Sequence, residues 1–257
     1  AMPVAILAGT AIYEIPWIEA TERQIETPYG EARIFEGKEE HADVLFLPRH
    51  GKDHSIPPHR VNYRANIKAL EMMGVRYALA AYAVGSINRE IPPLSLVALD
   101  DLIDFTWGRE STYFEGGSAR VHHVDMSEPY CPRLREALLE LAPEMELPLR
   151  PHGTYVATNG PRLETPAEIR MFAQLGGDVV GMTAFPECVL AKELGICLAG
   201  VGFSVNWAAG IEEKIHFVEQ GLSLLIDRLL RLFVRTLREV AGEESAESAS
   251  GKLAPEV

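Results

Sequence analysis

The stretch Tyr77–Val84, with the sequence YALAAYAV, is the longest apolar run in this chain of 257 residues. Polar and apolar residues do not alternate in it, which is typical of a strand that is covered on both faces. A helix needs about 20 apolar residues to cross a bilayer, so the run is too short to be a membrane span. It therefore predicts a central strand of a soluble protein.

Other apolar runs surround this one, and stretches with helical spacing lie between them. The further runs are Pro3–Ala8, Val44–Leu47, Leu94–Leu99, Tyr155–Ala157, Asp178–Gly181 and Cys197–Val205. The helical stretches are Val61–Met73, Pro132–Ala142, Pro166–Leu175, Pro186–Leu194 and about His216–Val240. Strands that alternate with helices predict an α/β fold with a largely parallel sheet.

One domain is predicted over residues 3–241, because no linker or internal repeat divides this part of the chain. Within it, Thr165, Pro166 and Glu168 have the pattern of a helix N-terminus with a capping box. From Gly242 the sequence becomes GEESAESASG, which cannot bury enough apolar surface to offset the entropy of ordering it. We therefore expect a disordered acidic tail over residues 242–257.

The charge of the chain limits its partners. Lys and Arg number 24 against 37 Asp and Glu, which gives a formal net charge of −13. This excess opposes binding to nucleic acids and to anionic membranes, so an anionic substrate requires a local basic pocket. The chain does not begin with a basic region and an apolar segment, and we expect a cytoplasmic protein. Cys131, Cys188 and Cys197 are widely spaced, so we expect reduced packing residues, without a disulfide or a zinc site.

Three histidines gather in the segment Arg49–His59, RHGKDHSIPPH. A metal site, a solvated loop and an anion-binding loop led by Arg49 and His50 are all open interpretations. The glycine and two prolines make a metal site the least favoured, and none is expected. His122 and His123 are expected at the surface or at an interface. P-loop, dinucleotide-binding, serine-esterase and zincin motifs are absent from the sequence.

Polar residues and glycines follow three of the predicted strands. These segments are Gly9-Thr10, Arg49-His50-Gly51 and Gly181-Met182-Thr183. Glycine lets backbone amides approach an anion, and a guanidinium suits phosphate oxygens. Ligands of open α/β sheets bind beyond the carboxyl ends of the strands, so the three segments are able to converge on one phosphate. Glu164 and Asn206 follow two other strands and offer groups that read a base.

These motifs, in this order, resemble the 5′-methylthioadenosine phosphorylase branch of the trimeric purine nucleoside phosphorylases. Further motifs that carry the resemblance are Val61-Asn62-Tyr63-Arg64-Ala65-Asn66-Ile67, Ala83-Val84-Gly85-Ser86, Asp104-Phe105-Thr106, Asn159-Gly160-Pro161-Arg162 and Pro186-Glu187. The resemblance covers residues 4–240 and implies that inorganic phosphate attacks the anomeric carbon of a purine nucleoside. It also implies a three-layer α/β fold with a central mixed sheet between helices, and a homotrimer with each site near a subunit interface. Phosphate is then a co-substrate, and neither a cofactor nor a metal is required.

The resemblance also implies residue roles. Phosphate would be held by Thr10, Arg49, His50, Thr183 and the backbone near Ala83. Met182 would lie under the ribose, and His123 would reach into the site of a neighbouring subunit. Val218 and Leu222, early in the last helix, would meet the 5′-alkylthio group. Two glycines and a small hydroxyl residue that are usual in the family are replaced in this chain by Ala8, Ala11 and Tyr82.

Glu164 and Asn206 favour a 6-oxopurine base. An ionised carboxylate facing N1 accepts the hydrogen of a 6-oxopurine but meets a lone pair on adenine. In the adenine-specific members of the branch, a Ser replaces Glu164 and an Asp-x-Asp pair replaces the Asn206 segment. We therefore expect Asn206, Glu164 and His50 to be the catalytic residues of a 6-oxopurine phosphorylase that prefers S-methyl-5′-thioinosine. His216 offers a partner for a 5′-hydroxyl, which keeps inosine or guanosine open, and methylthioadenosine is the third candidate.

Two other classes of protein remain open at this stage. A non-catalytic nucleoside-binding protein has no need of the phosphate groups Arg49, His50 and Thr183, so their presence argues against it. A hydrolase that uses water instead of phosphate differs in forming product without added phosphate.

Overall fold

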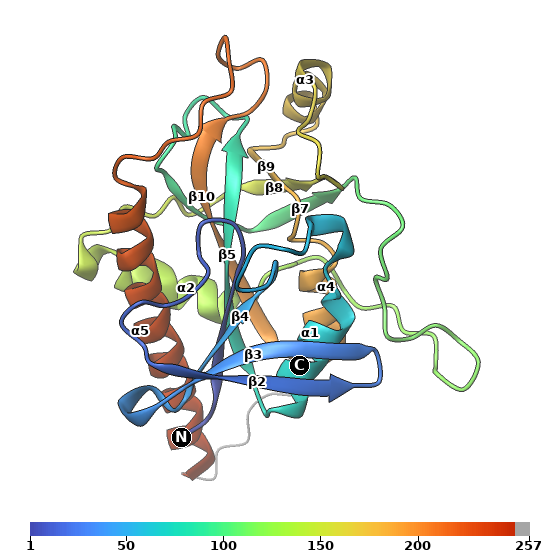
Figure 1. Cartoon of the computed structure of the whole chain (residues 1–257), viewed down its shortest axis with the longest axis vertical. Helices are drawn as coiled ribbons and strands as arrows, with labels where there is room; N and C mark the ends of the chain where they lie inside the picture. The colour runs from blue at the N-terminus through green and yellow to red at the C-terminus, as the bar shows by residue number, and fades with distance from the viewer. Residues whose placement is uncertain (250–257) are drawn as a thin grey trace.

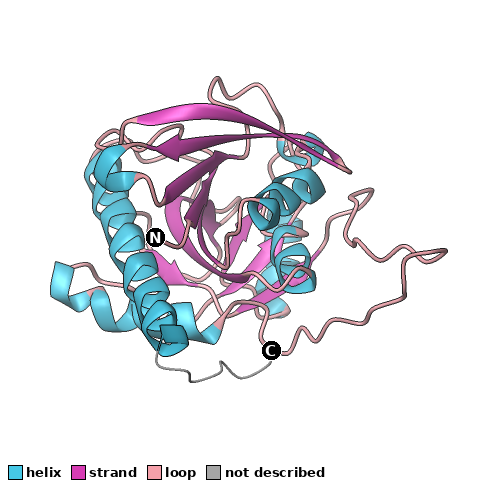
Figure 2. Ribbon diagram, turned by 90° about the horizontal axis from the view of Figure 1, so that it is seen from below, coloured by secondary structure: helices cyan, strands magenta, loops and turns pink. Residues whose placement is uncertain are grey.

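The computed structural model describes residues 1–249, which form a ten-stranded mixed sheet with helices on both faces (Figures 1 and 2). The strands are β1 (Val4–Ala8), β2 (Ala20–Thr27), β3 (Gly30–Gly37), β4 (Val44–Pro48), β5 (Tyr77–Ser86), β6 (Leu96–Ala98), β7 (Asp101–Asp104), β8 (Thr154–Ala157), β9 (Val179–Gly181) and β10 (Cys197–Trp207). Their order is β2-β3-β4-β1-β5-β9-β8-β7, while β10 pairs with β5 and with β6. The predicted α/β fold with a central mixed sheet is confirmed.

Every predicted apolar run forms a strand, but three strands were not predicted. β2, β3 and β7 lack the apolar runs that revealed the others, and most of β2 is exposed. The hairpin of β2 and β3 is closed by the Thr27 hydroxyl, which donates to the carbonyl of Gly30 over 2.6 Å. Gly30 has a φ of 118°, a left-handed conformation that favours glycine. Backbone pairing and this turn, rather than apolar burial, make the hairpin.

The helices form the two outer layers. They are α1 (Tyr63–Met72), α2 (Pro132–Leu141), α3 (Pro166–Gln174), α4 (Glu187–Glu193) and α5 (Leu222–Ala249), with short 3-10 turns at Glu39–His41, Pro58–Arg60 and Pro143–Met145. α2 and α5 pack on one face of the sheet, and α1 and α4 pack on the other (Figure 1). α3 covers β8 and β9 through Ile169 and Phe172, and Thr165 begins it with the predicted capping box. Within residues 1–249, none of these helices combines the length and apolar character of a membrane crossing.

The last helix differs from its predicted bounds at both ends. It begins at Leu222 rather than His216, and it continues to Ala249 through a segment predicted to be disordered. The helix continues because Glu244, which is 3% exposed, pairs with Arg76 over 2.7 Å. The prediction of a disordered tail is therefore wrong for residues 242–249, and residues 250–257 lie outside the described part of the chain.

The cysteine prediction is also wrong in part. Cys131 and Cys197 form a disulfide, with Cα atoms 5.3 Å apart, whereas Cys188 is buried and free as expected. The first residue of β10 meets the residue that precedes α2, where the N–H of Cys131 donates to the carbonyl of Leu198 over 2.7 Å. The two cysteines are 66 residues apart, so their spacing gave no sign of this contact.

Residues 105–130 connect β7 to α2 as a long loop that projects from the body of the molecule (Figures 1 and 2). We call this loop the arm. Arg109 holds the first part of the arm against the body, because its guanidinium donates to the carbonyls of Phe185 and Asn159 over 2.7 and 3.0 Å. Farther along, Glu193 of α4 accepts hydrogen bonds from Thr112 and Tyr113. The arm is thus anchored to the body on its near side.

Candidate functional site

The first two candidate segments begin side by side because β1 and β4 are parallel neighbours. Ala8 lies opposite Pro48, and the N–H of Arg49 donates to the carbonyl of Ala8 over 2.8 Å. The segment that starts at Gly9 and the segment that starts at Arg49 therefore leave the sheet at the same point.

The third segment approaches this point from the opposite direction. β10 pairs with β5 from Tyr77 to Ser86 and occupies one edge of that strand, so β1 and β9 share the other edge. β1 is parallel to β5 and β9 is antiparallel to it, so their carboxyl ends point toward each other. Met182 and Thr183, which follow β9, thus meet Gly9. Ligands of open sheets bind beyond the carboxyl ends of strands, and here the carboxyl ends of β1, β4 and β9 come together.

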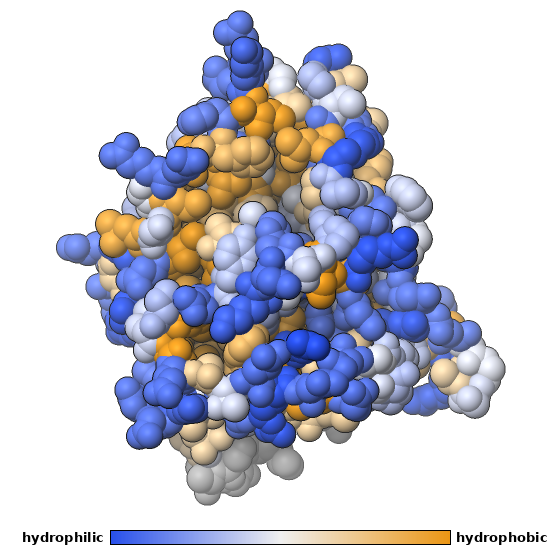
Figure 3. All heavy atoms as spheres, viewed as in Figure 1, coloured by the Kyte–Doolittle hydropathy of each residue, from blue (hydrophilic) through white to orange (hydrophobic). Residues whose placement is uncertain are grey.

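A cavity lies between these strand ends. Eight of the eleven residues predicted to bind phosphate or nucleoside line it, namely Thr10, Arg49, His50, Ala83, Glu164, Met182, Thr183 and Asn206, whereas His123, Val218 and Leu222 do not. The face in Figure 3 is hollowed over the upper ends of β5 and β10, and hydrophobic residues surround the hollow. The remainder of that face is mostly hydrophilic. Most of the residues that the sequence predicted for the site therefore lie around one cavity of a single subunit.

Gly9 lies where the turn after β1 comes close to His50 and Arg49. A Cβ at this position would lie 2.8 Å from Nε2 of His50 and 3.5 Å from Nη1 of Arg49. The missing side chain therefore lets an imidazole and a guanidinium approach the turn after β1. Ala11, two residues after Gly9, has a φ of 70°, which is the left-handed conformation that a glycine adopts more easily.

His50 is a neutral imidazole with a defined tautomer. Its Nδ1 lies 2.8 Å from the carbonyl oxygen of Ile56, and because a carbonyl only accepts, Nδ1 carries the hydrogen. Burial, together with the charges of Arg49 and His54, lowers the pKa of His50 to about 4, against the opposing effect of the Ile56 hydrogen bond. Nε2 is therefore an acceptor at neutral pH.

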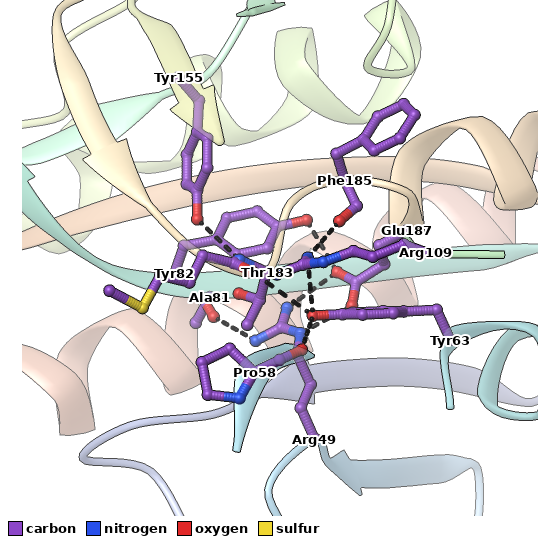
Figure 4. Close-up of polar contacts among 11 residues, drawn as sticks. Arg49, Pro58, Tyr63, Ala81, Tyr82, Arg109, Tyr155, Thr183, Phe185 and Glu187 are labelled. Carbon is purple, nitrogen blue, oxygen red and sulfur yellow. Dashed lines mark hydrogen bonds and ion pairs between the residues drawn. The ribbon is translucent and has the colours of Figure 1, made fainter. Parts of the chain in front are cut away.

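Arg49 does not present an unpaired fork to the cavity, as the sequence led us to expect. It is 2% exposed, and its Nε and Nη2 lie 2.7 and 2.9 Å from the carboxylate oxygens of Glu187 (Figure 4). Thr183 is also held from behind, since its N–H donates to the hydroxyl of Tyr155 over 3.1 Å. No role was predicted for Glu187 beyond its place in the Pro186-Glu187 motif.

Glu164 lies at the other end of the cavity and is half-buried. The Thr158 hydroxyl donates to its Oε2 over 2.7 Å, and the capped start of α3 at Thr165 fixes the following backbone. Burial raises the pKa of the Glu164 carboxyl, and the Thr158 hydrogen bond opposes that shift. One carboxylate oxygen is thus held by the protein, which orients the other.

A β-bulge brings Asn206 into the cavity. The register of β10 against β5 shifts between Ser204 and Asn206, and consecutive residues Val205 and Asn206 both line the cavity. Consecutive side chains of a regular strand point to opposite faces, so the extra residue of the bulge makes this possible. The Asn206 amide nitrogen donates one hydrogen to the carbonyl of Trp207 over 2.8 Å, which leaves its second hydrogen for a ligand.

The prediction for the 5′ end is corrected. Val218 does not line the cavity, and its side chain packs against the core near α5. Its N–H donates to the carbonyl of Val205, and the chain is not yet helical there. Ile215 and Phe217 line the cavity instead, while His216 between them is exposed and outside the lining. The side chains alternate here, since the helix expected from His216 begins only at Leu222.

His123 lies on the arm, is exposed, and does not line the cavity of its own subunit. Its role in a neighbouring site stays a prediction. His54 and Pro58 also line the cavity, although no place in the site was predicted for either residue. Both residues belong to the histidine-rich segment Arg49–His59, which was the sequence feature that pointed to them. The anion-binding interpretation of that segment agrees with the positions of Arg49 and His50 at the cavity.

The comparisons with known proteins agree with this geometry. The family model described as the phosphorylase superfamily matches residues 3–238. The chain belongs to the phosphorylase superfamily. A 6-oxopurine nucleoside phosphorylase of Pyrococcus furiosus is 50% identical over 216 residues, which cover 82% of each chain. A probable S-methyl-5′-thioinosine phosphorylase of Methanopyrus kandleri is 45% identical over 223 residues, which cover 86% of this chain and 85% of the relative.

Solved structures of the phosphorylase superfamily share the fold. A methylthioadenosine phosphorylase from Schistosoma mansoni, in complex with tubercidin, superposes with a TM-score of 0.88 at 28% identity. The alignment covers 98% of this chain and 96% of that one. As a phosphorylase, the protein uses phosphate as the attacking group, and the groups around Gly9 form the part of the cavity with suitable chemistry.

Proposed function

We propose that this phosphorylase cleaves S-methyl-5′-thioinosine with inorganic phosphate, giving hypoxanthine and 5-methylthioribose 1-phosphate. The observation that carries the proposal is one cavity with Arg49, His50 and Thr183 at one end and Glu164 and Asn206 at the other. Arg49 and Thr183 offer donors to an anion, and Nε2 of His50, an acceptor, suits the remaining hydrogen of a monohydrogen phosphate. Glu164 and Asn206 suit the edge of a purine.

The chemistry follows from the placement of charge. A phosphate oxygen bonds to the anomeric carbon as the bond from that carbon to the purine nitrogen breaks. Positive charge that develops on the ribose is stabilised by the adjacent phosphate, which Arg49 and Thr183 hold. Negative charge that develops on the purine is met at N7 by the free amide hydrogen of Asn206. The departing base then takes a proton from solvent.

Glu164 supports a 6-oxopurine over adenine. With Oε2 engaged by Thr158, Oε1 accepts the N1 hydrogen of hypoxanthine, whereas adenine would set its N1 lone pair against the carboxylate. An unmatched buried polar pair costs about 1–3 kcal/mol, and more when one group is charged. The names of the P. furiosus and M. kandleri relatives support the same choice of base.

The apolar 5′ end supports a methylthio group over a hydroxyl. Ile215 and Phe217 line the cavity, and His216, the residue that offered a hydrogen bond to a 5′-hydroxyl, lies outside the lining. Inosine or guanosine remains the second candidate, because relatives named as 6-oxopurine nucleoside phosphorylases are as similar to this chain as the methylthioinosine relatives.

A homotrimer in which the arm brings His123 to the neighbouring site belongs to the same proposal. The arm exposes apolar side chains, with Trp107 75% and Val121 72% exposed, and a neighbouring subunit would cover them. A sedimentation experiment on the full chain tests this, with a monomer as the contradicting result. We also propose a cytoplasmic location. Outside hyperthermophiles a disulfide is unusual in the cytoplasm, so cell fractionation is needed to test this location.

The decisive experiment measures release of free base from S-methyl-5′-thioinosine, inosine, guanosine and methylthioadenosine, each with and without phosphate. Phosphate-dependent release of hypoxanthine, fastest from the methylthio substrate, is expected. Base release without phosphate would indicate a hydrolase, and no release at all would indicate a binding protein. Inosine as the fastest substrate would contradict the apolar 5′ end, and adenine release as the fastest reaction would contradict the role of Glu164.

A paired substitution tests the base end separately. Glu164→Ser with Asn206→Asp removes the acceptor for N1–H and supplies a carboxylate near N7 and the amino group. We expect the preference to move toward the adenine nucleoside. Retention of hypoxanthine selectivity in the double variant would contradict the assignment of these two residues.

A further inference from the structure

Behind the phosphate end lies a buried cluster that the proposed reaction does not use directly (Figure 4). Glu187 accepts the two hydrogen bonds from Arg49 and a third from the Tyr82 hydroxyl over 2.8 Å. Nη1 of Arg49 donates to the carbonyl of Ala81 over 2.9 Å. The Tyr82 ring centre lies 4.6 Å from the guanidinium carbon. Glu187 is 1% exposed, so water does not compete for these contacts.

The cluster determines which hydrogens of Arg49 are left for a ligand. A guanidinium has five N–H groups, and the protein accepts three of them, at Nε, Nη2 and Nη1. One hydrogen remains on each terminal nitrogen. Nη1 lies beside Gly9, 3.5 Å from where a Cβ would be, and Arg49 lines the cavity. The remaining hydrogen of Nη1 is therefore held in a fixed position beside Gly9.

The cluster also connects the segments that contain Thr183 and Ala83, the residues predicted for the other phosphate contacts. Glu187 begins α4 four residues after Thr183, and Tyr82 directly precedes Ala83 in β5. Tyr82 does not line the cavity, whereas Ala83 does. A displacement of Glu187 would thus move Arg49 relative to two neighbouring contacts.

Both partners of Glu187 keep their protons at neutral pH. Burial alone would lower the pKa of Arg49, but the Glu187 carboxylate more than offsets this and raises it above the ordinary value. Burial, and then the charge of Glu187, raises the pKa of Tyr82 well above its ordinary value. Arg49 and Tyr82 therefore both remain donors to Glu187 at neutral pH.

We propose that Glu187, supported by the Tyr82 hydroxyl, is a positioning residue for inorganic phosphate that acts by holding the Arg49 guanidinium in its binding orientation. This rests on the proposed function, because it assumes that the anion beside Gly9 is the phosphate co-substrate. Glu187 itself does not line the cavity.

The direction in which Glu187→Gln changes phosphate binding follows from two opposing effects. Loss of the negative charge would, by itself, strengthen the attraction of Arg49 for phosphate. However, glutamine has one acceptor oxygen in place of two, so its amide group sets a donor against one of the two Arg49 N–H groups, at Nε or Nη2, that Glu187 accepts. A misplacement of about 1 Å in an active site costs about a hundredfold in rate. We expect the loss of position to dominate.

A double-mutant cycle tests the inference. It compares wild type, Glu187→Gln, Arg49→Met and the double variant by kcat/KM for phosphate at saturating nucleoside. We expect Glu187→Gln to lower this value at least about tenfold, with KM for the nucleoside changed less than about twofold, and to have almost no further effect in the Arg49→Met background. An unchanged KM for phosphate in Glu187→Gln, or an equal loss in both backgrounds, would overturn the proposal.

Two further variants separate this role from folding. Glu144→Gln breaks an exposed ion pair with Arg235, remote from the cavity, and is the matched control that should keep wild-type kinetics. Should Glu187→Gln fail to fold in circular dichroism, Tyr82→Phe decides, since it removes only the hydroxyl that supports Glu187. We expect it to raise KM for phosphate about threefold or more, and an unchanged KM would overturn the role of Tyr82.

Failure of this inference is distinguishable from failure of the proposed function. Calorimetry of the wild-type protein with inorganic phosphate alone reports the anion site without a nucleoside. If wild type binds phosphate and Glu187→Gln binds it equally well, the positioning role is wrong while the phosphorylase assignment stands. If wild type releases base without phosphate, the proposed function is wrong.

Discussion

The substitution Gly9→Ala tests the phosphate end with a single methyl group. The added Cβ would lie 2.8 Å from Nε2 and 2.9 Å from Cδ2 of His50, whereas ordinary contacts begin at 3.4 Å. The imidazole or the turn after β1 must therefore move by about 0.6 Å. The imidazole has little freedom, because it is 4% exposed and bound to Ile56.

The magnitude follows from this displacement. A shift of about half an ångström to an ångström corresponds to a loss of about tenfold to a hundredfold in catalytic efficiency. We expect KM for phosphate to rise by that factor, with a smaller change in KM for the nucleoside, whose base end lies away from Gly9. Overpacking of this kind lowers the free energy of unfolding by about 1–3 kcal/mol.

The assay varies phosphate at saturating nucleoside, and thermal unfolding checks that the variant is folded. Gly242→Ala is the matched control, since Gly242 lies in α5 with nothing within 4 Å of an added Cβ. That substitution should keep wild-type kinetics and gain up to about 1 kcal/mol of helix stability. A wild-type KM for phosphate in Gly9→Ala would refute the assignment of this turn to the phosphate site.

Three further predictions concern other parts of the molecule. Asn206→Ala should lower kcat far more than it raises KM for the nucleoside, and an unchanged kcat would refute its leaving-group role. Cys131→Ser opens the 66-residue loop closed by Cys197 and should cost about 4 kcal/mol of unfolding free energy, so equal melting temperatures under non-reducing conditions would contradict it. The His50 imidazole should titrate in an NMR experiment with a pKa of about 4. Because the unfolded chain binds that proton more readily, stability should fall as the pH is lowered from about 6.5 toward 4, and a titration near 6.5 would contradict the burial argument.

The sequence by itself determined the seven strands with apolar runs and eight of the residues that line the cavity. A buried strand requires a local apolar run, as in Tyr77–Val84, and a helix start is encoded by neighbours such as Thr165 and Glu168. Glycine and polar residues at strand ends identified the phosphate segments for the same reason. Each of these features depends on residues a few positions apart, so one stretch of chain is enough to reveal it.

Only the tertiary structure decided the contacts between distant segments. Glu187 and Arg49 are 138 residues apart, and their pairing depends on β4 and α4 reaching the same side of β5. The same holds for the disulfide between Cys131 and Cys197 and for the bulge that turns Asn206 into the cavity. The free energy of such contacts comes from burial and geometry that many parts of the chain create together. No local pattern in the sequence carries that information.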